Sequence, residues 1–209
     1  MRTEPRLLVV RHGETPYNVE PERIRGWLDP PLTIKGKTEA TRLAKEIAPM
    51  HPAQVYTSDL KRARDTATAI AQAAKLKPPT PLRGLRPWNL GDWQGKPVED
   101  HEADMVEAVR YSTRKVPGGE AFATFVGRYT SVLKAIASKA IAQNSTIVIV
   151  THLRNTLVTD ALVESEDQAG PPRYGALPSS FVYEPQEEVA EPCDYLDLRY
   201  TNGAWHESK

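Results

Sequence analysis

The chain has 209 residues, 40% hydrophobic and 26% charged, which suits one soluble globular domain with a sizeable core. Basic and acidic residues both number 27, so the chain lacks the basic excess typical of proteins that bind nucleic acid. A single cysteine, Cys193, and the lack of any apolar run long enough to span a bilayer predict a cytoplasmic protein with no membrane partner.

The first half of the chain predicts two strands, each followed by a helix. Residues 6–10 and 53–58 are short apolar runs typical of buried strands in a parallel sheet. Thr33 is a suitable N-cap for a helix that Pro49 would end. Its expected inner face is Ile34, Ala40, Leu43, Ala44 and Ile47. A second helix is expected over about 59–74.

The second half continues the alternation. Residues 118–144 predict a long amphipathic helix, 145–152 a third apolar strand, and 155–164 a short helix. The tail has β character at 179–184 and 193–200. We therefore expect one domain over 1–209, a three-layer α/β/α sandwich with a mostly parallel central sheet. The stretch from about 81 to 118 is rich in turn residues, and we expect it to be an irregular substrate loop.

The first strand is followed at once by Arg11, His12 and Gly13. A neutral imidazole can attack phosphorus and form a covalent phosphoenzyme. Arg11 would offer bidentate contact to phosphate oxygens, and Gly13 would let the backbone turn closely around the site. An isolated Arg-His pair is more often a solvated strand end, so this hypothesis depends on further groups.

The other two predicted strands also end near groups that suit an anion. Arg62 and Arg64 lie at the start of the helix after the second strand, where a helix N-terminus favours anions. His152 follows the third strand and could donate a hydrogen bond to phosphoryl oxygens. Each group alone also fits a solvated helix face or a satisfied histidine. Because parallel strands place their carboxyl ends at one edge, the three groups together predict an anion site there.

In their order and spacing these motifs resemble the histidine phosphatase superfamily, also called the phosphoglycerate mutase-like family. The resemblance covers residues 7 to about 160. The matching residues are Arg11, His12 and Gly13 with Thr15 and Asn18; "GWLDPPLT" from Gly26 to Thr33, then Gly36; Ser58, Leu60, Arg62, Ala63, Thr66 and Ala67; and His152.

The resemblance implies a phosphoglycerate mutase-like fold and roles for the matching residues. His12 would be the phosphorylated nucleophile, and Arg11, Arg62 and His152 would complete the phosphate pocket. Further substrate contacts would come from Gly13, Thr15, Asn18 and the backbone N–H of Leu153. The family position favours Arg62 over Arg64. We expect neither a cofactor nor a metal ion.

The proton donor usual in this family is missing. The main branch has a glutamate where "LRPWNLGDWQG" has Pro87, and the other branch has an acid where this chain has Leu153. Asp92 is our first candidate for a replacement because it lies in the aligned loop, although an exposed turn residue is an equally good interpretation. The other candidates are Glu14, Glu99 and Asp100.

The sequence "HLRN" after the third strand resembles the small phosphohistidine phosphatases of the family. Arg154 would lie near the mouth of the site, where it could bind a second anion or, on the plainer interpretation, face solvent.

We expect a metal-independent phosphatase that hydrolyses small phosphomonoesters through a phosphohistidine on His12. The alternatives are a phosphohistidine phosphatase acting on a phosphoprotein, a phosphoglycerate mutase-like phosphotransferase, and a weakly active phosphate-binding module. An apolar edge in the β-rich tail could pair two copies into a homodimer, or be covered within one copy.

Overall fold

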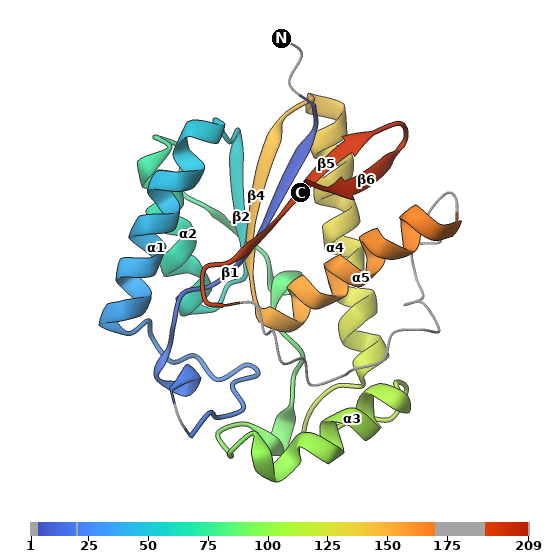
Figure 1. Ribbon diagram of the computed structural model, residues 1–209. Coiled ribbons are helices and arrows are strands. Elements are labelled where there is room, and N and C mark those ends of the chain that lie inside the picture. Colours follow the sequence, from blue (N-terminus) through green and yellow to red (C-terminus); the bar gives the residue numbers. More distant parts are fainter. Residues whose placement is uncertain (1–3, 20, 170–190, 209) are drawn as a thin grey trace.

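The computed structural model describes residues 4–19, 21–169 and 191–208. The described residues form a six-stranded sheet with the strand order β3-β2-β4-β1-β5-β6 (Figure 1). Its strands are β1 (Arg6–Arg11), β2 (Gln54–Thr57), β3 (Thr80–Pro81), β4 (Thr146–Thr151), β5 (Tyr195–Thr201) and β6 (Ala204–Glu207). The first four run parallel, and β5 is antiparallel to both β1 and β6.

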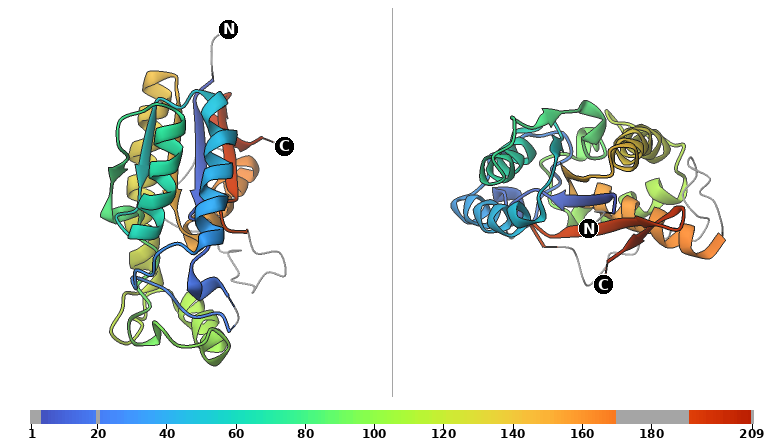
Figure 2. Two further views of the ribbon diagram at one scale, coloured as in Figure 1. Left: turned by 90° about the vertical axis from the view of Figure 1, so that its left-hand side faces the viewer. Right: turned by 90° about the horizontal axis from the view of Figure 1, so that it is seen from above.

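Helices cover both faces of the sheet, which gives the expected three-layer α/β/α sandwich (Figure 2). Leu8 and Val10 of β1 pack in a cluster with α1 (Ile34–Ile47) and α2 (Lys61–Ala73). Leu7 and Val9 pack in the opposite cluster with α4 (Phe122–Gln143) and α5 (Leu153–Ala169). Because both faces are covered, β1 reads as a continuous apolar run without alternation.

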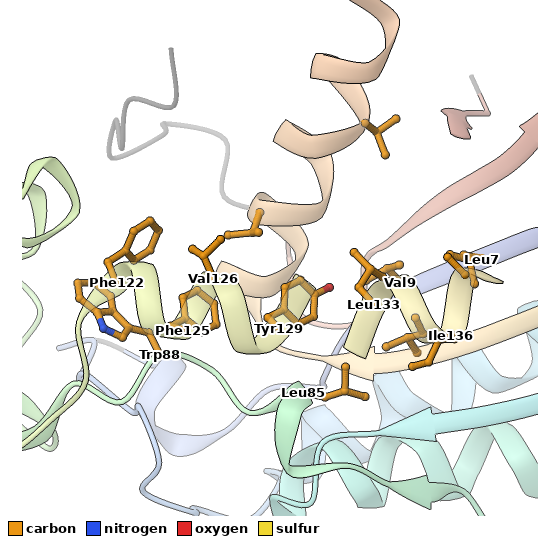
Figure 3. Packing of buried hydrophobic residues seen from close by; sticks show 14 of the residues in the cluster. Leu7, Val9, Leu85, Trp88, Phe122, Phe125, Val126, Tyr129, Leu133 and Ile136 are labelled. Carbon is orange, nitrogen blue, oxygen red and sulfur yellow. The ribbon is translucent and has the colours of Figure 1, made fainter. Parts of the chain in front are cut away.

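Helix α4 connects the sheet to the loops at its lower edge. Its buried residues recur every three or four positions and form a row against Leu7, Val9 and Leu85 (Figure 3). At the first turn of α4, the Phe122 ring meets the fully buried Trp88 ring edge-on, 5.0 Å between centroids. The loop that carries Trp88 is therefore anchored in the core.

The first helix begins and ends as expected, but its inner face differs at one residue. Thr33 caps α1 by accepting from the Gly36 N–H at 2.9 Å. Ile34 is 86% exposed, so its assignment to the inner face is wrong. At 100° per residue, Ile34 lies about 120° around the helix from Ala40, which is buried. The core-facing residue of the first turn is Gly36.

The region 81–118 is not wholly irregular, because it contains α3 (Glu102–Arg110) between several short 3-10 turns. Figure 1 shows α3 beyond the carboxyl ends of the parallel strands. The tail strand expected at 193–200 is confirmed as β5, whereas the strand expected at 179–184 lies outside the described residues. Within the described part of the chain, no helix has the length and apolar character needed to cross a membrane.

Candidate active site

His12 follows β1 directly, and its ring is fixed by two contacts. Nδ1 lies 2.7 Å from the Gly13 carbonyl, which can only accept, so Nδ1 carries the proton. Nε2 then presents its lone pair and accepts from Arg62 Nε at 3.1 Å. The ring is 2% exposed. The nitrogen that faces Arg62 is therefore the one able to act as a nucleophile.

The surroundings of His12 keep its ring neutral. Burial lowers the pKa of His12 well below its usual value, and the charges of Arg62 and Arg25 lower it further. The hydrogen bond to the Gly13 carbonyl opposes this shift. A nucleophilic imidazole must be unprotonated, and this environment provides that at neutral pH.

Arg62 lies in the first turn of α2, and each of its three guanidinium nitrogens donates a hydrogen bond. Nη1 donates to the Leu28 carbonyl at 2.7 Å, and Nη2 donates to the Gly26 carbonyl at 2.9 Å. Burial, and then the charge of Arg25, lowers the pKa of Arg62 to about 9. Arg62 thus stays protonated at neutral pH while lying 3.1 Å from Nε2 of His12.

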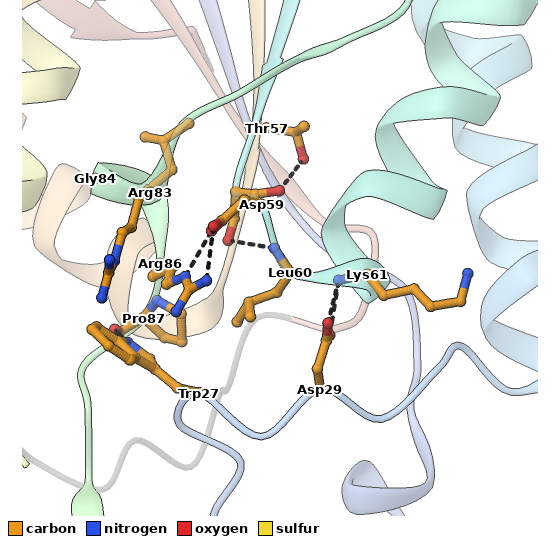
Figure 4. A network of polar contacts seen from close by, with 12 residues as sticks. Trp27, Asp29, Thr57, Asp59, Leu60, Lys61, Arg83, Gly84, Arg86 and Pro87 are labelled. Carbon is orange, nitrogen blue, oxygen red and sulfur yellow. Dashed lines mark hydrogen bonds and ion pairs between the residues drawn. The ribbon is translucent and has the colours of Figure 1, made fainter.

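A surface network holds the loop that carries these carbonyls (Figure 4). Asp29 accepts from the Lys61 backbone N–H at 2.8 and 2.9 Å and so caps the start of α2. Trp27 Nε1 donates to the Pro87 carbonyl at 2.9 Å, which ties the loop to the segment before α3. The position of Arg62 thus depends on contacts between segments far apart in the sequence.

His152 follows β4 and faces His12. The two rings lie 5.1 Å apart between centroids, at an interplanar angle of 67°. His152 is 3% exposed, and neither ring nitrogen has a hydrogen-bond partner among the described residues. Burial, followed by the charge of Arg62, lowers its pKa well below the usual value. One ring N–H is therefore buried beside His12 and able to donate to an oxyanion.

These groups open on a cavity of about 280 Å³. Its wall includes five of the predicted site residues, which are His12, Arg62, His152, Leu153 and Arg154. The structure therefore brings together groups that the sequence separates by up to 142 positions.

The remaining predicted contacts are not among the residues that line the cavity. Arg11 is 3% exposed and lies close enough for its charge to lower the pKa of His12. The Gly13 N–H donates to Thr66 Oγ1 at 3.1 Å. Thr15 donates to Asn18 Oδ1 from its N–H at 2.9 Å and from Oγ1 at 3.0 Å, so this oxygen closes a turn.

The structure does not place Asp92, the predicted replacement proton donor, among the residues that line the cavity. Its N–H donates to the Pro117 carbonyl at 2.9 Å, and the residue is exposed. Its carboxylate occupies the space beside Gly118, where an added Cβ would come within 2.3 Å of Oδ1. The turn thus directs this carboxylate towards the 117–119 segment.

The carboxylates that do line the cavity are Glu22 and Glu102, and further guanidiniums come from Arg23 and Arg25. Sequence reasoning missed all four. Arg25 had a usable signal, because it directly precedes the Gly26 motif whose carbonyl binds Arg62. Glu22 and Glu102 had none, since each reaches the wall only through the path of its loop.

A phosphoglycerate mutase-like α/β sandwich with two facing imidazoles and a guanidinium at its strand ends defines a class of phosphoryl-transfer enzymes. Residues 7–170 match the family model described as histidine phosphatase superfamily (branch 1), and the chain belongs to that superfamily. Phosphoglycerate mutase-like protein 4 of Arabidopsis thaliana is 38% identical over 154 residues, which cover 70% of this chain and 65% of that protein.

Two further comparisons lead to phosphatases. A glucosyl-3-phosphoglycerate phosphatase of Mycobacterium tuberculosis is 39% identical over 99 residues, 47% of this chain and 44% of the relative. The chain thus spans less than two thirds of the length of both curated relatives. A solved mycobacterial glucosyl-3-phosphoglycerate phosphatase, in complex with VO3, superposes with a TM-score of 0.72 at 25% identity, covering 98% of this chain and 97% of that one. These similarities support a hydrolase.

Proposed function

We propose that the chain is a metal-independent phosphatase that hydrolyses phosphomonoesters through a phosphohistidine on Nε2 of His12. The observation that carries this proposal is the neutral His12 ring, whose lone pair faces Arg62 while the unpartnered His152 ring stands 5.1 Å away. The named phosphatases among the relatives support the hydrolytic outcome.

The reaction has two displacements. In the first, Nε2 of His12 forms a bond to phosphorus as the ester P–O bond breaks and the alcohol oxygen leaves with the electron pair. Arg62 Nε transfers its hydrogen bond from Nε2 to a phosphoryl oxygen, and an N–H of His152 donates to another. In the second, water attacks phosphorus and the P–N bond breaks, with its electron pair returning to Nε2. One proton of the water stays on the phosphate and the other passes through solvent to the alcohol oxygen, so inorganic phosphate and the alcohol are the products.

The proposed intermediate can be trapped. Brief incubation with a ³²P-labelled aryl phosphate and alkaline quenching should leave label on His12, released by acid because phosphohistidine is labile to acid. The reaction is run with and without a chelator, and we expect equal rates.

His12→Asn should lose both label and turnover. His51→Asn is the matched control, because His51 is exposed and has φ of 50°, a left-handed conformation that asparagine tolerates. Turnover that survives in His12→Asn would refute the covalent route, and turnover that the chelator abolishes would refute the metal-independent route.

A further inference from the structure

The peptide group between Gly13 and Glu14 forms a hydrogen bond on each of its two sides. Its carbonyl oxygen accepts from Nδ1 of His12 at 2.7 Å. Its N–H donates to Oε2 of Glu39, in the second turn of α1, at 2.9 Å. Because the C=O and N–H of a trans peptide point in opposite directions, the Glu39 carboxylate and the His12 ring lie on either side of one peptide group. Two hydrogen bonds therefore connect Glu39 to the nucleophile.

The start of α1 holds this peptide group in place. A Cβ added to Gly36 would come within 2.8 Å of the Glu14 nitrogen, and one added to Gly13 would come within 2.6 Å of the Gly36 carbonyl oxygen. The two glycines thus allow a close approach of the backbones. The Thr33 N–H donates to the Glu14 carbonyl at 3.0 Å. Glu39 follows Gly36 by three positions and so lies on the same face of the helix, from which it reaches the peptide N–H.

The Glu39 carboxylate interacts with the peptide group more closely than with the neighbouring cation. Lys35 Nζ lies 3.6 Å from Oε1 of Glu39 and 2.8 Å from Oε2 of Glu14. The Lys35 side chain is 67% exposed, whereas that of Glu39 is 15% exposed, so solvent weakens their ion pair. Oε2 of Glu39 accepts from the peptide N–H. A hydrogen bond to a carboxylate is about twice as strong as one between neutral groups.

This arrangement has a consequence for the attack on phosphorus. A peptide N–H that donates to a carboxylate polarises its own carbonyl group, which strengthens the next hydrogen bond by about 10–30%. The stronger acceptor keeps the proton on Nδ1 of His12 and the lone pair on Nε2. As Nε2 bonds to phosphorus, the ring gains positive charge, so the hydrogen bond from Nδ1 strengthens in the transition state. Glu39 can thus affect the rate without lining the cavity.

Taking the phosphohistidine route as given, we propose that Glu39 is a positioning residue that acts on His12 through the Gly13–Glu14 peptide group. It holds the proton on Nδ1 and stabilises the charge that the ring gains on phosphorylation. A carboxylate has the same effect on the histidine of a serine protease triad, where it contacts the ring directly. Here a peptide group stands between the two side chains.

Nuclear magnetic resonance of the resting protein, with ¹⁵N-labelled histidine, tests the coupling without turnover. His12→Asn assigns the Nδ1–H resonance of His12. We expect this resonance to move upfield in Glu39→Gln, which keeps an acceptor and loses the charge, and further upfield in Glu39→Ala. Glu46→Gln is the matched control, because it removes the same charge from α1. The Glu46 carboxylate accepts from the Tyr195 hydroxyl at 2.8 Å, and this substitution should leave the resonance unchanged.

The rate of His12 phosphorylation, measured by rapid quench with a ³²P-labelled aryl phosphate, tests the catalytic effect. We expect labelling to be about threefold slower in Glu39→Gln and about tenfold slower in Glu39→Ala. The inhibition constant of inorganic phosphate should not change, since Glu39 is not among the residues that line the cavity. Glu46→Gln should label at the wild-type rate.

A purely structural role of Glu39 predicts a different result. Both substitutions of Glu39 would then lower the free energy of unfolding in urea, while the resonance and the labelling rate would match those of Glu46→Gln, and this inference would be overturned. An upfield shift in the Glu39 variants, with no label on wild-type His12, would instead refute the phosphohistidine route and leave the coupling of Glu39 to His12 standing.

Discussion

Replacing Pro87 by glutamate should give the cavity a proton donor for the leaving oxygen. Pro87 lines the cavity, and its carbonyl accepts from Trp27 Nε1 at 2.9 Å and Arg128 Nη2 at 3.2 Å, contacts that any residue would keep. Arg86 before it has φ −60° and ψ 152°, which requires no proline after it. We therefore expect Pro87→Glu to fold, with a cost of about 1 kcal/mol or less from the lost ring and a further cost because residue 87 is buried.

The size of the gain depends on the charges around the new carboxyl group. A positioned general acid contributes about 10²–10⁴ to a rate. Arg25 and Arg62 line the same cavity and favour the ionised carboxylate, so we expect the lower end, about 10²-fold, for alkyl phosphates. Aryl phosphates should change by less than about threefold, because a phenolate leaves without a proton. The alkyl rate of the variant should rise as the pH falls towards the pKa of the new carboxyl group.

The assay is kcat/KM for glycerol phosphate and for 4-nitrophenyl phosphate. Pro87→Gln is the matched control, since it removes the ring and adds a side chain of the same length without an acidic proton. An alkyl-to-aryl ratio that is the same in both variants would refute the reasoning, because the leaving oxygen would then lie away from residue 87 or already have a donor.

Three further outcomes follow from the geometry. Arg62→Lys keeps the charge but loses the planar guanidinium and its hydrogen bonds, so kcat/KM for aryl phosphates should fall about 10²-fold. The circular dichroism spectrum should not change. An unchanged kcat/KM would contradict the phosphoryl-binding role of Arg62. Gly36→Ala would place a Cβ 2.2 Å from the Glu14 carbonyl oxygen and should lower the free energy of unfolding, measured by urea titration, by about 2 kcal/mol or more. Gly127→Ala, whose Cβ would have nothing within 4 Å, should raise it by about 0.5–1 kcal/mol. Equal effects of the two substitutions would contradict the close approach at Gly36. The two buried imidazoles have lowered pKa values in the folded state, so the unfolded chain binds more protons and the free energy of unfolding should fall as the pH drops below about 6.5. Asparagine at both positions should flatten that pH slope in urea titrations, and an unaltered slope would contradict the shifts.

The sheet could be predicted from sequence because its central strands have apolar side chains on both faces. Leu7, Leu8, Val9 and Val10 alternate between two clusters, and no polar residue interrupts the run. Ile34 could not be placed by hydrophobicity, since its position around α1 decides burial. Helix α3 and the short strand β6 were missed, because the segments around them are dominated by turn residues.

The two imidazoles and the guanidinium of the site could also be predicted, because strand ends in a parallel sheet share one edge. The rest of the wall depends on a contact between distant loops. The Ile24 N–H donates to the Lys96 carbonyl at 2.9 Å, and the Gly95 N–H donates to the Ile24 carbonyl at 2.8 Å. This pairing brings Glu22 and Arg25 to the cavity, and no local sequence pattern encodes it.

The direction of the pKa shift distinguishes an arginine that forms a structural ion pair from the arginines that line the cavity. Arg86 forms two hydrogen bonds with Asp59, and this pairing raises its pKa, as a structural ion pair should. Burial instead lowers the pKa of both Arg25 and Arg62, and the charge of Arg11 on Arg25 and of Arg25 on Arg62 lowers them further, which disfavours the folded state. An oxyanion in the cavity relieves that repulsion and accepts from the buried donors of Arg25 and His152. The arrangement that disfavours folding therefore favours the phosphate ester over the alcohol that it yields, so the alcohol is bound less tightly than the substrate.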